Sequence, residues 1–215
     1  MALLHKKKTE VPKDAVKLTE EQALVYFGKI IEGWENRSDV WALIYTPGIL
    51  GSATVASSIY INSHYRARLK LGTYGRLSSY LPAVVLPAIM TTFFHKAFIV
   101  PDVILNRTGC PVCTQTRAGL IQAGFSTAYP MLLAPMSAFM FATRHFTYRL
   151  PSITSEPREV FRLYRKMTGP ITLVVTGFLA FNLLLSMFLT GKEVEAVYRI
   201  NLALEAPLRA EREAL

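Results

Sequence analysis

The stretch CPVCTQTRAGLIQAGFSTAYPMLLAPMSAFMFA, residues 110–142, decides how this chain folds. It begins in a short polar connector that holds two cysteines, and from residue 118 to residue 142 it has no charged side chain. An apolar helix of about this length can cross the hydrocarbon core of a bilayer. The stretch therefore predicts a membrane-spanning helix that follows directly on a cysteine-containing loop.

Three further apolar segments flank this one, at residues 41–62, 78–100 and 168–190. As a helix, residues 41–62 would extend about 33 Å, enough for a hydrocarbon core of roughly 30 Å. Charged residues form 18% of the chain, below the roughly 25% of soluble domains, and they lie mostly between these segments. We therefore predict an all-α fold: a four-span helical membrane bundle (residues 41–190) with amphipathic terminal helices.

The residues outside the spans form two tails and three connectors. In the N-terminal tail, residues 1–40, a capping-box pattern at residues 19–22 precedes apolar residues at helical spacing. It predicts an amphipathic helix at residues 19–35, which would lie on the membrane surface, on a partner or on the protein's own loops. A second amphipathic helix is expected at residues 157–167. Gly191 is expected to end the fourth spanning helix, and residues 191–215 to form a charged helical tail.

Four prolines fall within the second and third predicted spans. Pro82 and Pro87 should kink or loosen the second span, and Pro130 and Pro135 should break the third near its midpoint. Proline has no backbone N–H to donate and its ring crowds the preceding turn, so neighbouring helices must satisfy the freed carbonyls.

The net charge of +9 lies mainly in the connectors between spans. Counting Lys and Arg, residues 63–77 hold four and residues 143–167 hold six, whereas the loop 101–117 holds two. By the positive-inside rule, the two basic connectors should face the cytoplasm or matrix, with both termini and the cysteine loop on the opposite side. We find no nucleic-acid-binding motif, so the charge indicates topology and a lipid bilayer as partner.

Small residues at helical spacing predict close packing faces on the first and third spans. These helix-docking faces comprise Gly48, Ser52, Ala53, Ser57, Gly119, Ala123, Gly124 and Ala128. They could pack inside the bundle, which we favour for the first span, or receive a helix of another membrane protein.

Cys110 and Cys113 form the constellation with the clearest chemical interpretation. On an oxidising side of the membrane, the pair predicts a disulfide that closes the loop. The alternatives are a free structural pair, a redox-active dithiol without the βαβ unit that usually carries one, and a metal site that would need His95 as well. We predict no metal site and no cofactor.

The spans themselves lack Asp, Glu, Lys, Arg and His when the second is taken to residue 94. We therefore expect buried surfaces without an ionisable side chain, which argues against an ion pump or proton-coupled carrier. Gln122 and Asn182 are expected to form interhelical hydrogen bonds. The alternative is that they line the path of a neutral-solute transporter or channel. No catalytic arrangement is present, so we predict that the protein is not an enzyme.

The chain resembles the transmembrane protein 126 family over residues 60–151, whereas the tails and the first and fourth spans match only in layout. Pro135 departs from the family pattern by standing one place early. The matching residues are Cys110, Cys113, Thr116, Arg117, Gly119, Leu120, Tyr129, Pro130, Leu133 and Ala134, with Asn62, Ser63, Arg66, Leu81, Pro82, Pro87, Thr91 and Thr92 upstream and Leu150 and Pro151 downstream.

This resemblance implies a mitochondrial inner-membrane, multi-pass protein that assists the assembly of respiratory-chain complex I. Such a protein would act as a chaperone that binds and stabilises nascent membrane-arm modules of the NADH dehydrogenase. Its partners would be complex I membrane-arm subunits and other assembly factors. In that setting the basic connectors would face the matrix, and both termini and the Cys110–Cys113 loop would lie on the intermembrane-space side.

Overall fold

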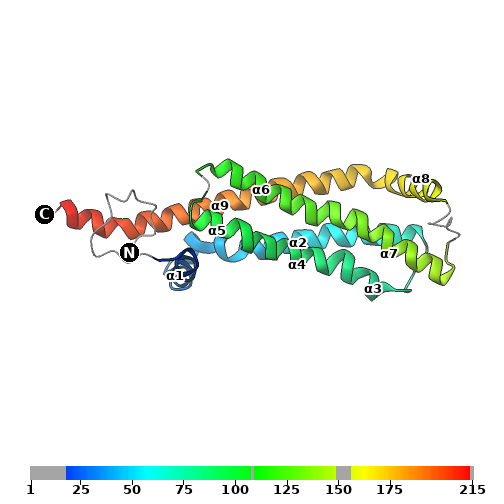
Figure 1. Cartoon of the computed structure of the whole chain (residues 1–215), viewed down its shortest axis with the longest axis horizontal. Helices are drawn as coiled ribbons and strands as arrows, with labels where there is room; N and C mark the ends of the chain where they lie inside the picture. Colours follow the sequence, from blue (N-terminus) through cyan, green and yellow to red (C-terminus); the bar gives the residue numbers. More distant parts are fainter. Residues whose placement is uncertain (1–17, 108, 149–155, 214–215) are drawn as a thin grey trace. The chain divides into compact units, whose positions relative to one another are not determined.

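The structure, a computed structural model, describes residues 18–107, 109–148 and 156–213, with side chains up to residue 206. Residues 1–17 of the predicted N-terminal tail and the family residues Leu150 and Pro151 lie outside these ranges. Over the described residues the chain forms helices and no strand. The helices are labelled along the chain in Figure 1.

The helical elements follow one another with short connections. They are α1 (Glu20–Glu32), α2 (Arg37–Arg68), α3 (Arg76–Tyr80), η1 (Leu81–Val85), α4 (Leu86–Phe94), η2 (His95–Ile99), α5 (Val100–Ile104), α6 (Pro111–Ala123), η3 (Gly124–Ala128), α7 (Tyr129–His145), α8 (Pro157–Thr168), η4 (Gly169–Ile171) and α9 (Thr172–Glu213). Joined end to end, they give four helices long and apolar enough to cross a membrane: Arg37–Arg68, Arg76–Ile104, Pro111–His145 and Pro157–Ala206. The predicted all-α, four-span membrane fold is confirmed.

Helix α1 begins at the predicted capping box. The side-chain hydroxyl of Thr19 accepts from the Gln22 amide at 3.3 Å, and the Gln22 side chain accepts from the Thr19 amide at 3.0 Å. These two bonds satisfy amides that a helix N-terminus leaves without partners. Ala23 and Phe27 are buried on one face, so the predicted amphipathic helix is confirmed.

The prediction that Pro130 and Pro135 break the third span is wrong, because the chain stays helical from Pro111 to His145. The second span also stays helical, and near prolines both helices widen instead. Three π-helical turns, η1, η2 and η3, each end two residues before a proline, namely Pro87, Pro101 and Pro130. Directly after η1 and η3, the amide of the residue before the proline donates to the carbonyl five residues back. Such a turn leaves more room for the proline ring, which would clash with the carbonyl four residues back in a regular helix.

The C-terminal helix corrects the expectation that Gly191 ends the fourth span, because α9 continues to Glu213. Gly191 instead lies where α9 packs closely against the side chain of Gln115 on α6. A Cβ atom built on it would lie 3.1 Å from the side-chain nitrogen of Gln115. The glycine therefore allows α6 to approach α9 closely and does not end the helix. The helix propensity of residues 192–206 favours its continuation.

The chain divides into two compact units, each of which takes parts of all four spanning helices. Unit 1 comprises Met1–Pro47, His95–Ala118 and Met187–Leu215, and unit 2 comprises Gly48–Phe94 and Gly119–Ser186. In unit 1 the buried apolar residues come from α1, α2, η2, α5, α6 and α9.

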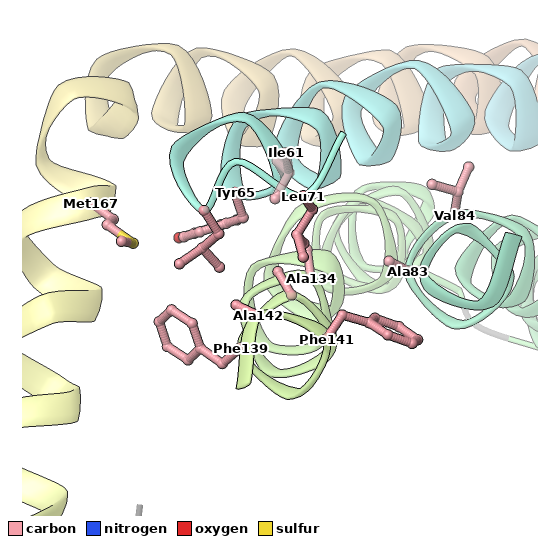
Figure 2. Packing of buried hydrophobic residues seen from close by; sticks show 12 residues of the cluster. Ile61, Tyr65, Leu71, Ala83, Val84, Ala134, Phe139, Phe141, Ala142 and Met167 are labelled. Carbon is pink, nitrogen blue, oxygen red and sulfur yellow. The ribbon is translucent and has the colours of Figure 1, made fainter. Parts of the chain in front are cut away.

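Unit 2 has a hydrophobic core to which α2, η1, α7 and α8 contribute (Figure 2). Phe139 and Phe141 point to opposite sides of α7, and Tyr65 points from α2 toward Met167 of α8. Val160 and Tyr164 pack against this cluster, whereas Phe161 is exposed. The predicted amphipathic helix at residues 157–167 is therefore present, with one face on the core of unit 2.

Candidate functional site

The predicted helix-docking residues divide into a buried and an exposed group. Ser57, Gly119 and Ala123 are buried. The hydroxyl of Ser57 donates to the carbonyl of Ser126 at 3.0 Å, which ties α2 to η3. These residues serve packing inside unit 2.

Three other members of the predicted faces, Gly48, Ser52 and Ala128, are exposed. Ala53 and Gly124 are partly buried. A Cβ atom built on Gly48 would meet no atom within 4 Å, so the surface beside this residue is open. The exposed group could receive another helix, and docking there stays a prediction.

Gln122 and Asn182 form the interhelical hydrogen bond that the sequence predicts. The side-chain nitrogen of Gln122 donates to the side-chain oxygen of Asn182 at 2.9 Å. The same nitrogen lies 3.2 Å from the Leu50 carbonyl and 3.1 Å from the Thr54 hydroxyl, which itself reaches Thr91 at 3.3 Å. This buried network joins all four spans in unit 2. The side chains of Gln122, Asn182, Thr54 and Thr91 in this network are all buried.

A buried pair of ionisable groups, His95 and Glu193, contradicts the expectation of buried surfaces without such groups. The Nε2 atom of His95 lies 3.0 Å from each carboxylate oxygen of Glu193, and both side chains are almost fully buried in unit 1. The sequence pattern around Glu193 indicates its burial, but only when the helix is taken to continue past Gly191. Glu193 falls at helical spacing among the buried residues Leu189, Ala196 and Ile200.

A second charged cluster in unit 1 surrounds Asp102, which is also buried. Its carboxylate contacts Arg107 at 3.5 Å and Arg117, whose guanidinium also donates to the Phe98 carbonyl at 2.9 Å. Arg107 in turn pairs with Glu20 of α1. The charges of the loop 101–117 therefore tie α1, α5 and α6 together.

The first connector contains a buried arginine with a structural role. The Arg66 guanidinium donates to the carbonyls of Gly72 at 2.9 Å, Tyr74 at 2.9 Å and Gly75 at 3.3 Å, and to the Ser79 hydroxyl at 2.7 Å. It thereby fixes the turn between α2 and α3. One of the four basic residues counted for topology is thus engaged inside unit 2, and the orientation stays a prediction.

The two cysteines lie at the start of α6, and both are free and exposed. The amide of Cys113 donates to the Cys110 sulfur at 3.3 Å. Two hydrogen bonds from Cys113, the larger effect from its side chain and the smaller from its backbone, lower the pKa of the Cys110 thiol, because they stabilise its thiolate. The disulfide stays a prediction.

Among the described residues, no group of three or more His, Cys, Asp and Glu side chains could hold a metal ion. His95, which a metal site with the cysteines would have required, contacts Glu193 instead.

Comparison with known proteins adds the family. No solved structure is significantly similar to this chain. A curated relative, "Transmembrane protein 126" of Drosophila melanogaster, is 50% identical over 203 residues, which cover 94% of this chain and 91% of the relative. The sequence model of the family Transmembrane protein 126 matches residues 30–201. The resemblance seen at the cysteine loop is confirmed, and the chain belongs to the transmembrane protein 126 family.

Proposed function

We propose that this protein is a mitochondrial inner-membrane assembly factor that binds and stabilises nascent membrane-arm modules of respiratory-chain complex I. It would act without catalysis, by covering helix faces of subunits that have not yet met their permanent neighbours. Support comes from the family resemblance and from a multi-pass helical fold that leaves one small-residue surface open.

The observation that carries the proposal is the exposed pair Gly48 and Ser52 on α2. The two residues are one helical turn apart and therefore lie on the same face. In a bilayer, small side chains at this spacing let a second helix approach closely enough for backbone packing, which lipid tails achieve less well. The Ser52 hydroxyl is satisfied within its own helix, since it donates to the Ile49 carbonyl at 2.8 Å. A partner helix can thus contact this face without leaving that hydroxyl unsatisfied.

The test is affinity purification of the tagged chain from digitonin-solubilised mitochondria, with its partners identified by mass spectrometry. We would compare the wild-type protein with Gly48→Leu, which places a bulky side chain where no neighbouring atom lies within 4 Å. The matched control is Gly177→Leu, an equally open position on α9 outside the proposed face.

We expect the wild type and Gly177→Leu to recover complex I membrane-arm subunits and assembly factors, and Gly48→Leu to lose most of them. Recovery of no such protein by the wild type would contradict the assignment to complex I. Equal recovery by both variants would contradict the role of the Gly48 face while leaving the assignment in place.

A further inference from the structure

A charged cavity of about 300 Å³ lies in unit 1 where the start of α2 meets the C-terminal part of α9. Its lining consists of Ser38, Asp39, Trp41 and Ala42 of α2 and Lys192, Glu195, Ala196 and Arg199 of α9. The volume corresponds to roughly ten water molecules, so the cavity can take a small polar group.

The charges in this cavity balance, with two carboxylates and two cations. The Arg199 guanidinium lies 2.5 Å from the Glu195 carboxylate and 3.6 Å from that of Asp39. The Lys192 amine lies 2.8 Å from Glu195. A ligand that carries one positive and one negative group preserves this balance, whereas an anion or a cation alone does not.

The charged groups are also accessible to a ligand. The side chains of Lys192 and Glu195 are each 41% exposed and that of Arg199 is 56% exposed. Ion pairs exposed to this extent contribute little to stability. Each charged side chain can therefore give up its ion-pair partner and bind a ligand instead at small cost in free energy. Asp39 is more enclosed, with 29% of its side chain exposed.

The position of the cavity along the chain points to lipid headgroups. Trp41 is the first residue of the apolar stretch 41–62, and Lys192 follows the apolar stretch 168–190. Tryptophan and lysine at the ends of the apolar stretches of spanning helices lie at headgroup level. Phe188, one turn before Lys192 on α9, is exposed, and its ring centroid lies 5.9 Å from the Lys192 amine. An acyl chain can therefore follow α9 from the cavity toward the hydrocarbon core.

We propose that this cavity binds the headgroup of a zwitterionic phospholipid, phosphatidylcholine or phosphatidylethanolamine. Arg199 and Lys192 would hold the phosphate, for which guanidinium and ammonium groups are suited donors. Asp39 and Glu195 would hold the lipid ammonium, with the Trp41 ring as an additional surface for the cation. This site is independent of the proposed role in complex I assembly.

The experiment is native mass spectrometry of the full chain released from nanodiscs of phosphatidylcholine, phosphatidylethanolamine and phosphatidylglycerol in equal amounts. We expect the wild type to retain a zwitterionic lipid over phosphatidylglycerol by roughly tenfold, the effect of one well-placed charged contact. Arg199→Gln should lose this retention. Glu195→Gln gives the cavity a net positive charge and should shift the preference toward phosphatidylglycerol. The control, Arg162→Gln, removes an arginine paired with Glu159 at 2.7 Å outside the cavity and should behave as the wild type.

A second measurement does not depend on the folding of these variants. The sequence has two tryptophans, so Trp34→Phe leaves Trp41 as the reporter inside the cavity. Brominated phosphatidylcholine should quench its fluorescence more strongly than brominated phosphatidylglycerol at the same mole fraction. Equal quenching by the two lipids, equal retention of all three lipids, or equal losses in Arg199→Gln and Arg162→Gln would overturn the proposal.

Discussion

Buried polar groups are held in different ways in the two units of this protein. In unit 2, the network at Gln122 and Asn182 uses neutral amides and hydroxyls, each of which lies inside an apolar stretch. In unit 1, His95 and Glu193 form a buried pair that can carry charge. A neutral hydrogen bond in a membrane contributes little, whereas a buried ionisable group depends strongly on its partner. The comparison suggests that unit 1 is the more vulnerable to loss of a single side chain.

The largest expected effect is that of Glu193→Ala. It leaves His95 buried without its partner and should lower the free energy of unfolding by about 3–5 kcal/mol. Unfolding in mixed detergent micelles, followed by circular dichroism, measures this loss. The double variant His95→Leu/Glu193→Leu should cost much less, because apolar side chains replace both members. A single variant as stable as the wild type would show that the pair does not matter, and the comparison between the units would fail.

The next largest effect is expected at Gly75, in the turn between α2 and α3. This turn is held by Arg66, the buried charged side chain of unit 2. Gly75 has a φ of +57°, and a Cβ atom there would lie 2.6 Å from the Cδ1 atom of Phe141. Gly75→Ala should therefore cost about 2–4 kcal/mol from backbone strain and overpacking together.

The matched control for this turn is Gly72→Ala, also at positive φ (+52°) but with no atom within 4 Å. It should cost only the backbone strain, about 1 kcal/mol. The same micelle unfolding assay compares them. Equal losses would mean that the packing of Phe141 against this turn contributes nothing.

A smaller effect is expected in the neutral network. Gln122→Leu removes three hydrogen-bond contacts and should lower the free energy of unfolding by about 1–2 kcal/mol. Asn182→Leu should not add its full cost on top, since the two side chains bond each other. Additive losses would indicate that they act separately. A liposome flux assay that compares the wild type with Asn182→Leu checks the transporter alternative. Solute flux in the wild type that is lost in Asn182→Leu would favour a transporter.

The smallest effect is a local change in reactivity at the cysteine pair. Because the pKa of Cys110 is lowered, more of it is thiolate at neutral pH than of an ordinary exposed cysteine. Under reducing conditions, Cys110 should react with iodoacetamide at a lower pH than a model thiol, as measured by peptide mass spectrometry across pH. In Cys113→Ser the hydrogen bond from the Cys113 thiol is lost, and this advantage should shrink. Labelling that appears only after reductant is added would instead establish the predicted disulfide.

Sequence patterns located the four spans because soluble proteins rarely contain uncharged stretches of membrane length, and they located α1 because its capping box is local. They also found Gln122 and Asn182, which are unusual polar residues in apolar stretches. They failed at His95 and Glu193, since each lies at the edge of an apolar stretch, where a charge can equally face water. The π-helical turns were missed as well, because a proline shows that the helix must adjust but not how.

Under the proposed function, the open small-residue face of α2 holds membrane-arm intermediates of complex I. Complexome profiling of mitochondria that express the wild type, Gly48→Leu or Gly177→Leu tests it most directly. We predict that the wild type and Gly177→Leu migrate with a membrane-arm assembly intermediate and that Gly48→Leu migrates at low mass. Migration of the wild type at low mass, or only with complexes unrelated to complex I, would rule out this function.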